Sequence, residues 1–394
     1  MADRGGNFAI MFTIASFPLL AGIGMAMEYS NLTAQRAKLQ NAVDAAILFA
    51  GRYLDQNDVL PAQADIEGFV DSNFDGPFTI SQLDQSGGKL SLTVDATIPA
   101  FFFGAVYPDV FDQQVSASVP YGGKSYLEIA MVLDSTGSMK HDGKMVALKT
   151  VANEFVDKLE AVKNAKNDIR IGLVPFSNYV NVGPANKFES WVNAPGGAWG
   201  GCVGSRPAPD TLIDGSVSVP FPGLNPSGCP TPLVELSNSA TDLKNGISAM
   251  NPSGWTYVGE GVMWGLRVLS AGAPFTDGVA FGSLPATTNH QKFLLVLTDG
   301  DNTRAPNLPG SSSHNKNDQS LADANTRAAC QEARDAGVVV YSIVFGTSVS
   351  ATGQAVMTDC AGDPKRYYTA ANAAALQSAF TEILSQLVTL RLSS

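Results

Sequence analysis

Two almost continuous apolar runs, each followed at once by an acidic and hydroxyl-rich turn, constrain the fold of this chain most strongly. Leu127–Leu133 and Phe293–Thr298 have the composition of strands that are buried on both faces. Such strands are typical of parallel sheets covered by helices. From about residue 125 onward, helical and strand-like segments alternate. This rhythm predicts an α/β fold built on a doubly wound, mainly parallel sheet.

Hydrophobic periodicity predicts the other elements of the α/β segment. We expect further strands at Ile169–Phe176 and Val338–Val344, with a short one at Tyr367–Tyr368. The expected helices are Gly143–Val162, Ala240–Met250, Val258–Leu269, Leu321–Ala336 and Ala371–Leu387. Residues 177–240 interrupt the rhythm because they are rich in Pro, Gly, Asn and Ser, and we interpret them as a loop-rich insertion.

The first 30 residues contain an apolar segment long enough to span a membrane. Phe8–Met27 carries no charged residue, and a helix of roughly 20 apolar residues crosses a bilayer. A cleaved signal peptide is the alternative, with Gly24–Ala26 as a weak cleavage site, but its apolar core is usually only about 7–15 residues long. We therefore expect a retained single-pass anchor. Arg4 before the span and Glu28 after it favour a cytoplasmic N-terminus.

A second compositional region lies between the anchor and the α/β segment. We divide the chain into an anchor (1–30), a stalk helix with a small α+β module (31–120) and the α/β domain (121–394). In the small module, apolar and polar residues alternate in three stretches, and Gly87-Gly88 is placed for a hairpin turn. These stretches are Phe78–Ile80, Leu90–Val94 and Val115–Val119. Tyr121–Gly123 reads as a linker.

Charge and cysteine usage narrow the function and the compartment. The formal net charge of −11 argues against a nucleic-acid partner, since phosphate binding needs a basic face. None of the four cysteines stands in a C-x-x-C pair, which argues against a zinc site. An even number of cysteines beyond a membrane span favours disulfides. Pairing Cys202 with Cys229 and Cys330 with Cys360 is the most economical of three arrangements, and buried free thiols are the alternative.

Three oxygen-rich segments are expected at one edge of the sheet. Asp134–Ser138 follows the first buried strand, Thr298–Asp301 follows the second, and Gly254–Gly261 precedes a helix. In open parallel sheets, ligands bind outside the carboxyl ends of the strands. Carboxylates and hydroxyls are ligands for hard cations. Taken singly, each segment also fits a helix cap or an ordinary turn.

Together, these segments resemble the metal-ion-dependent adhesion site of von Willebrand factor A domains. That pattern is Asp-x-Ser-x-Ser with a distant Thr and Asp. The resemblance implies five metal ligands, with a threonine in place of the usual first serine: Asp134, Thr136, Ser138, Thr256 and Asp299. It also implies a bound divalent cation, Mg²⁺ first and Mn²⁺ or Ca²⁺ as alternatives, whose open position takes a carboxylate from a protein partner. Glu260, Asp301 and His141 are interpreted as helix-start, turn and surface residues.

The N-terminal region resembles the TadE/TadG-like proteins of tight-adherence (Flp) pilus assembly. The residues that carry the resemblance are Arg4–Ile10, Glu28-Tyr29 and Leu39–Ala46 around the apolar segment. The TadG type joins such an anchor to a von Willebrand A domain. This implies a bacterial inner-membrane protein with its bulk in the periplasm or at the surface, and pilus or envelope components as partners. Met11 stands where small pilin-like relatives carry glutamate, which argues against prepilin-type processing after Gly6.

We therefore expect a non-enzymatic, membrane-anchored protein that binds a partner through a metal ion. One alternative is a Mg²⁺-dependent hydrolase using Asp134 and Asp299, for which the sequence offers no evident general base. Familiar motifs of hydrolases, nucleotide binding and zinc proteases are missing from the sequence. The other alternative is an intracellular A-domain adaptor for an ATPase, which the apolar segment and the paired cysteines disfavour.

Overall fold

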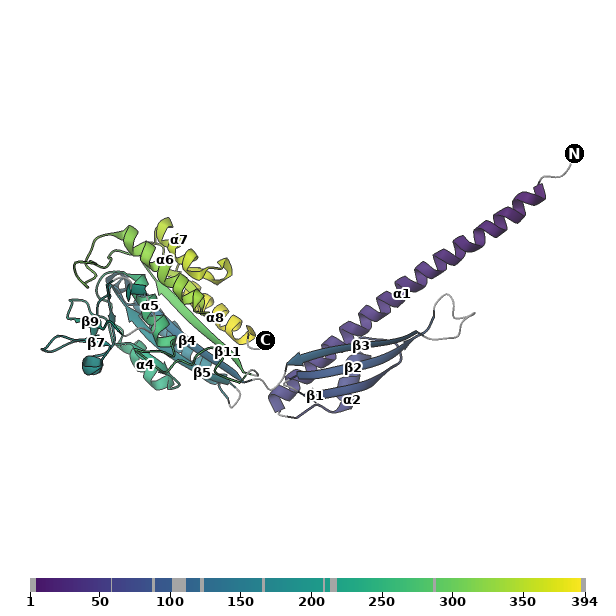
Figure 1. Cartoon of the computed structure of the whole chain (residues 1–394), viewed down its shortest axis with the longest axis horizontal. Helices are drawn as coiled ribbons and strands as arrows, with labels where there is room; N and C mark the ends of the chain where they lie inside the picture. The colour runs from purple at the N-terminus through teal and green to yellow at the C-terminus, as the bar shows by residue number, and fades with distance from the viewer. Residues whose placement is uncertain are drawn as a thin grey trace. The chain divides into compact units, whose positions relative to one another are not determined.

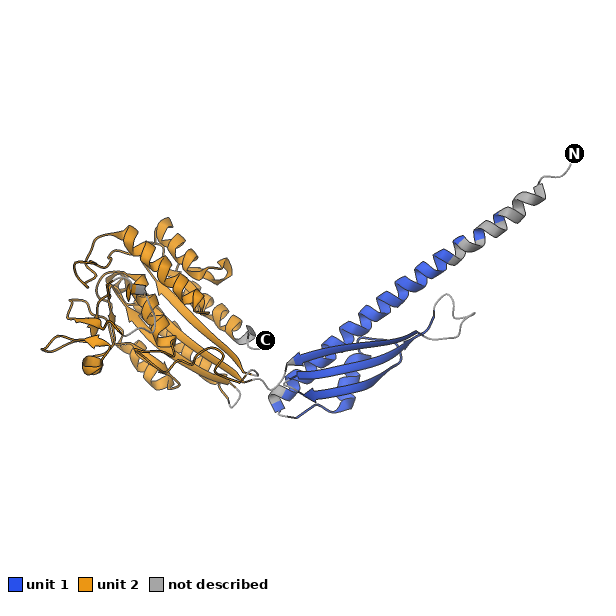
Figure 2. Cartoon of the chain, viewed as in Figure 1, with its two compact units in different colours: residues 1–123 blue, residues 124–394 orange. Residues whose placement is uncertain are grey.

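The computed structural model describes residues 5–57, 59–86, 89–100, 111–120, 124–164, 167–207, 210–212, 218–285 and 288–390. The chain divides into two compact units, residues 1–123 and 124–394, which Figure 2 shows in blue and orange. Each unit has its own sheet and its own hydrophobic core. The predicted turn at Gly87-Gly88 and the predicted linker Tyr121–Gly123 lie outside the described residues.

Unit 1 is a long helix that packs, with a short one, on a three-stranded antiparallel sheet (Figure 1). Apolar side chains of the long helix, such as Leu39 and Val43, are buried against Leu92 and Val94 of the middle strand. The strand order is β1-β2-β3. The elements are α1 (Gly5–Asn57), α2 (Gln63–Asp71), β1 (Phe78–Ser86), β2 (Lys89–Ile98) and β3 (Phe111–Pro120). The alternation seen in the sequence thus corresponds to real strands with one buried face.

The backbone of α1 continues as helix through Phe8–Met27, the segment predicted to span a membrane. More than half of the side chains in this segment lie outside the described residues. Within the described part of the chain, no helix combines the length and the apolar character that a membrane span requires. The anchor stays a prediction.

Unit 2 is a mixed α/β unit with strands and helices alternating along the chain (Figure 1). Its strands are β4 (Ser125–Asp134), β5 (Asn167–Phe176), β6 (Val180–Asn181), β7 (Val192–Asn193), β8 (Cys202–Val203), β9 (Phe221–Leu224), β10 (Val234–Ser237), β11 (Asn289–Thr298), β12 (Val339–Phe345) and β13 (Tyr367–Ala370). Its α-helices are α3 (Lys144–Ala161), α4 (Ala240–Ala249), α5 (Val258–Leu269), α6 (Gln319–Asp335), α7 (Ala351–Ala361) and α8 (Ala373–Leu390). Short 3₁₀ turns are η1 (Gly137–Lys140), η2 (Pro184–Phe188), η3 (Asp210–Leu212) and η4 (Pro364–Arg366).

The central sheet is mainly parallel and doubly wound, as predicted. Strands β13, β12, β11, β4 and β5 lie side by side and run parallel, and β10 pairs antiparallel with β5. On one face, Met131 of β4 packs with Leu148 of α3 and Phe380 of α8. On the other face, Val132 of β4 packs with Val262 of α5. Because neighbouring residues of β4 point to opposite cores, the strand is apolar from Ile129 to Leu133 on both faces.

Two features of unit 2 were not predicted from the sequence. The segment 177–240 is loop-rich as expected, but it also contains the short strands β6 to β9 and the edge strand β10, which extend the sheet. Trp191 and Phe221 of this segment pack on Trp264 of α5 and so attach it to the core. Helix α7 was not predicted. Its sequence is rich in small and polar residues, so its buried side, with Val356 and Met357, gives only a weak helical period.

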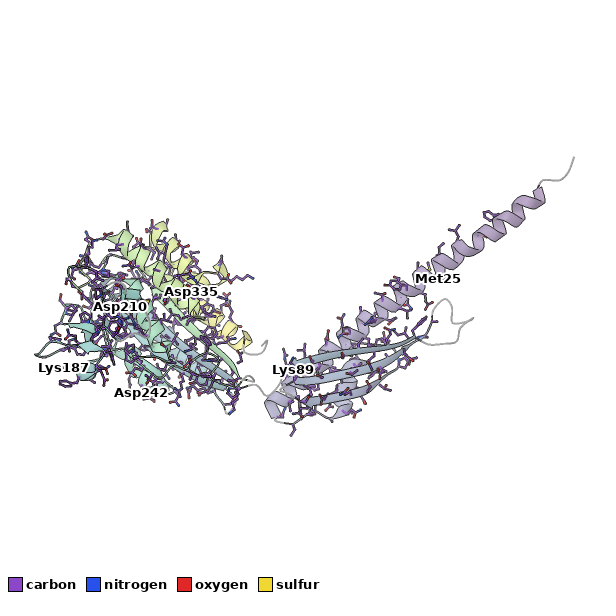
Figure 3. All side chains as sticks on the ribbon, in the orientation of Figure 1. Met25, Lys89, Lys187, Asp210, Asp242 and Asp335 are labelled. Carbon is purple, nitrogen blue, oxygen red and sulfur yellow. A yellow bond between two sulfur atoms is a disulfide. The ribbon has the colours of Figure 1, made fainter. Side chains whose placement is uncertain are left out.

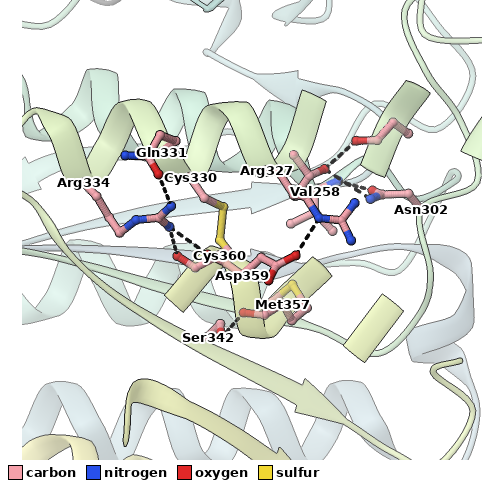
Figure 4. The surroundings of a disulfide bond; sticks show 12 residues. Val258, Asn302, Arg327, Cys330, Gln331, Arg334, Ser342, Met357, Asp359 and Cys360 are labelled. Atoms are coloured by element: carbon pink, nitrogen blue, oxygen red, sulfur yellow. Dashed lines mark hydrogen bonds and ion pairs between the residues drawn. A yellow bond between two sulfur atoms is a disulfide. The ribbon is translucent and has the colours of Figure 1, made fainter. Parts of the chain in front are cut away.

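Two disulfides close parts of unit 2, and both have the pairing expected from the sequence. Cys202 is bonded to Cys229 and Cys330 to Cys360. The second bridge joins α6 to α7, and beside it the Arg334 guanidinium donates to the carbonyl oxygen of Cys360 at 2.5 Å (Figure 4). The bridge and the arginine therefore fix α7, which has few large apolar contacts of its own, against α6.

Removing the Cys330–Cys360 bridge is expected to destabilise unit 2. The bridge joins residues 30 positions apart, and a closed loop of this size stabilises a fold by about 3.6 kcal/mol through the unfolded chain. The free energy of unfolding of the double variant Cys330→Ala/Cys360→Ala should be lower than that of oxidised wild type by about this amount, which a shift of the urea midpoint to lower concentration would show. An unchanged midpoint would show that the α6–α7 packing holds without the bridge.

Candidate metal centre

The two aspartates of the predicted site lie at the carboxyl ends of adjacent strands. Asp134 is the last residue of β4, and Asp299 follows the last residue of β11. These strands are direct neighbours, and the order of the sheet reverses between them, since β5 follows β4 on one side and β12 follows β11 on the other. Such a switch point leaves an open crevice where ligands bind in doubly wound sheets. The fold thus brings together two carboxylates that are 165 residues apart.

The loop after β4 is shaped by its own backbone. Asp134 Oδ1 accepts a hydrogen bond from the Thr136 N–H at 2.7 Å, which turns the chain back on itself. The N–H of Gly137 donates to the carbonyl oxygen of Gly254 at 3.1 Å. A Cβ at position 137 would lie 3.3 Å from that oxygen, so a glycine allows the two loops to touch. The loop then enters the 3₁₀ turn η1.

A chain of hydroxyl groups connects the two aspartates. Thr136 Oγ1 and Ser138 Oγ are 2.9 Å apart, and Ser138 Oγ donates to Asp299 Oδ1 at 2.5 Å. On the other side, Thr298 Oγ1 donates to Asp134 Oδ2 at 2.8 Å. Four of the five predicted ligands are therefore linked directly, and Thr298 joins them.

The fifth predicted ligand, Thr256, reaches the same place from the loop before α5. The position that a Cβ on Gly300 would occupy is 3.9 Å from both Ser138 Oγ and Thr256 Oγ1. The backbone of Thr256 is fixed by Thr303, whose Oγ1 accepts from the Thr256 N–H at 3.0 Å. Thr256 is almost fully buried. The hydroxyls of Ser138 and Thr256 therefore both lie beside Gly300, next to the same small space.

The site concentrates negative charge out of contact with water. Asp134 and Asp299 are both fully buried. Burial, together with the charge of Asp299, raises the pKa of Asp134 from 3.8 to about 7, although hydrogen bonds from Thr136 and Thr298 act in the opposite direction. Lys144 places one cation against the pair, since its Nζ lies 2.9 Å from Asp299 Oδ2. When both carboxylates are ionised, one ammonium compensates only one of their two negative charges, so a further cation would be attracted to the site.

This donor set fits a hard divalent cation such as Mg²⁺, Mn²⁺ or Ca²⁺ better than a softer metal such as zinc or copper. It consists of two carboxylates and three hydroxyls, with neither imidazole nor thiolate. In the described part of the chain, no three His, Cys, Asp or Glu side chains gather at one point. A bound ion would therefore keep few charged ligands and would attract an incoming anion.

Three polar residues near the site that were not predicted as metal ligands are Asp301, Glu260 and His141. Asp301 Oδ1 accepts from the Ser350 N–H at 3.0 Å, just before α7. Glu260 lies in the first turn of α5, but it is buried, and its Oε1 accepts from Trp264 Nε1 at 2.8 Å. His141 is exposed. The sequence analysis placed Thr298 in one of the segments at the site but gave it no role of its own. It did not include Lys144, for which the position of a lysine at the start of a helix was the available signal.

The N-terminal region matches a known family model. Residues 6–52 match the model described as putative Flp pilus-assembly TadE/G-like. The N-terminal segment is TadE/G-like. This TadE/G-like segment coincides with most of α1 and includes the residues quoted for the resemblance from Leu39 to Ala46. No curated protein matches the chain.

Solved structures that are similar to this chain include a domain of a pilus tip protein and a pilus adhesin. The vWF domain of the type V pili tip protein Mfa5 from Porphyromonas gingivalis is 12% identical, with a TM-score of 0.44, over 68% of this chain and 97% of that one. The pilus adhesin SpaC from Lactobacillus rhamnosus GG is 15% identical, with a TM-score of 0.43, over 80% of this chain and 35% of that one.

A third structure is proximal thread matrix protein 1 from the mussel byssus with a zinc-occupied MIDAS motif. It is 16% identical, with a TM-score of 0.38, over 66% of this chain and 47% of that one. This chain thus spans less than half of the thread matrix protein and about a third of SpaC. Likenesses this low do not assign a ligand or a partner to this chain.

Replacing Asp134 by asparagine is expected to stabilise the protein in buffer with EDTA. Because the pKa of Asp134 is raised on folding, stability falls as pH rises from 3.8 to about 7 and is level above that. The loss amounts to on the order of 4 kcal/mol at pH 8. Thermal unfolding at pH 5 and pH 8 should show a smaller pH dependence in Asp134→Asn than in wild type. If the pH dependence were equal in Asp134→Asn and wild type, burial beside Asp299 would not raise the pKa of Asp134 in the folded protein.

Proposed function

We propose that this chain is an envelope protein of a pilus system whose unit 2 binds a divalent cation and, through it, a carboxylate of a protein partner. The observation that carries the proposal is the pair of buried carboxylates at the switch point of the sheet, linked by hydroxyls. Asp134, Thr136, Ser138, Thr256 and Asp299 are the proposed ligands, with Mg²⁺ as the first expectation and Mn²⁺ or Ca²⁺ as alternatives.

The cation would supply an electrophilic centre that an anionic side chain can enter. The chain's own residues set the conditions for this: Asp134 and Asp299 provide the negative charge, and the hydroxyls are neutral ligands that leave the ion's charge only partly compensated. Burial of both carboxylates strengthens their attraction for a cation, because the effective permittivity in the site is lower than in water.

The surroundings of the site support a protein as the partner. Trp255, next to Thr256, is about half exposed, and the Arg304 guanidinium lies 4.0 Å from the centre of its ring. Arg304 is also held by the side-chain oxygen of Asn317 at 3.0 Å. Tryptophan and arginine are enriched at the energetically dominant positions of protein interfaces. A rigid Trp–Arg pair beside a metal-bound carboxylate would recognise the residues that flank that carboxylate in the partner.

We further propose that α1 anchors the chain in the inner membrane, with a cytoplasmic N-terminus. The described apolar side chains on its N-terminal part are more than half exposed, among them Met25, which Figure 3 labels. They are Phe12, Leu19, Ile23, Met25 and Met27. Exposed large apolar side chains on several sides of one helix need lipid or protein to cover them. The TadE/G-like match to residues 6–52 supports an envelope location and pilus components as partners.

Calorimetric titration of Mg²⁺, Mn²⁺ and Ca²⁺ into the full chain in detergent tests the metal site. Wild type should bind at least one of these ions at a single site, and Asp134→Ala should abolish binding, because it removes a fully buried ligand. The matched control is Asp157→Ala, which removes an exposed carboxylate that pairs with Lys244. Loss of binding in both variants, or retention in both, would contradict the assigned ligands.

Cell fractionation tests the anchor. The full chain should sediment with inner membranes and resist alkaline extraction, whereas a chain without residues 1–30 should be soluble, because it lacks the apolar part of α1. The shortened chain should still bind the metal ion found for the full chain. Release of the full chain by alkali would show that α1 is held by protein rather than by lipid.

A further inference from the structure

Lys144 forms an ion pair inside the candidate metal centre. Its Nζ lies 2.9 Å from Asp299 Oδ2, and its side chain is 12% exposed while that of Asp299 is fully buried. The other oxygen of Asp299, Oδ1, accepts from Ser138 Oγ at 2.5 Å. One proposed ligand is therefore shared between the hydroxyl chain of the site and an ammonium group of the protein itself.

The position of Lys144 is unfavourable for the helix that carries it. Lys144 is the first residue of α3, directly after Gly143, and this first turn contains no acidic residue. A cation at a helix N-terminus faces the positive end of the helix dipole. Helix stability therefore does not explain a lysine here, and the contact with Asp299 does.

The fold also leaves space for this side chain. Gly346 follows the last residue of β12, and a Cβ at that position would lie 3.2 Å from both Cε and Nζ of Lys144. Gly346 has φ +96°, a conformation that residues with a side chain rarely adopt. Lys144 thus lies in a slot between the ends of β11 and β12. The slot reaches the surface, because the side chain keeps some exposure.

We propose that Lys144 is a built-in counterion that competes with the divalent cation for Asp299 and thereby lowers the metal affinity of unit 2. This inference rests on the metal site proposed above. When the cation binds, the carboxylate of Asp299 coordinates the metal instead of pairing with Lys144, and the Lys144 side chain turns outward through its slot. Without the cation, the ammonium compensates the buried carboxylate and keeps the strand ends together. Metal binding and release then exchange one positive charge for another.

The test measures Mn²⁺ binding to the full chain in detergent by calorimetry, for wild type and Lys144→Met. Methionine keeps the length of the aliphatic chain and removes the charge. Lys144→Gln, which keeps an N–H donor for Asp299, is the second variant in case the first does not fold. Lys149→Met is the matched control: it removes the same charge from α3, but the Lys149 ammonium donates to the Ser248 carbonyl oxygen, away from the site.

The expected result is at least a tenfold tighter Kd for Lys144→Met and less than a twofold change for Lys149→Met. A unit charge within a few ångströms of a bound dication has an effect of this size even at an effective permittivity of about 20, whereas an exposed charge is screened by salt. In EDTA, Lys144→Met should melt at a lower temperature than wild type, because Asp299 loses its counterion.

A second readout needs no substitution. The amine of Lys144 in wild type should react faster with an acylating reagent when Mn²⁺ is present, as measured by peptide mass spectrometry, while the reactivity of Lys149 stays constant. Unchanged Lys144 reactivity in a protein that binds Mn²⁺ would show that the ammonium does not leave Asp299.

The outcomes separate this proposal from the metal site itself. If wild type binds Mn²⁺ and Lys144→Met binds it no more tightly, the competition is refuted and the metal site stands. Equal tightening in both lysine variants points to general charge attraction and also refutes the competition. If neither wild type nor any variant binds, both proposals fall. Binding that appears only in the Lys144 variants supports competition in its strongest form.

Discussion

The burial of the Asp134 carboxyl group beside that of Asp299 is the constraint around which the loops of the site in unit 2 are organised. Two negative charges out of contact with water repel each other, and the structure counters this with hydroxyl donors and one ammonium. Loops from three separate parts of the chain supply these groups, so neutralising the pair also holds the loops together. The same shortage of positive charge is the reason why we propose a cation as the ligand of this site.

Much of this arrangement could be predicted from the sequence, because parallel strands end at a common edge. The apolar runs before Asp134 and Asp299 identify two buried strands, and a doubly wound order makes them neighbours. The helices with a regular apolar period, such as Val258–Leu269, were predicted to the residue. In these places local pattern and tertiary position agree, so the pattern alone was sufficient.

Other features depend on contacts that no local pattern records. The strands of two residues in the segment 177–240 exist because neighbouring strands pair with them, and α7 because a disulfide and Arg334 hold it. Lys144 could equally have pointed into solvent from the first turn of α3. Its direction is decided by Gly346 and Asp299, which lie far away in the sequence. Contacts between residues that lie far apart in the sequence leave no local pattern, so they could not be predicted from it.

The course of β4 has a mechanical consequence. The chain enters this strand at Ser125, directly after unit 1, and leaves it at Asp134 in the site. A partner held at the site and pulled against the N-terminal segment would load β4 along its own axis. Its hydrogen bonds to β5 and β11 lie across that direction on both sides, so they would resist in shear as one set rather than open singly. The strand that carries Asp134 is thus also the one suited to carry tension.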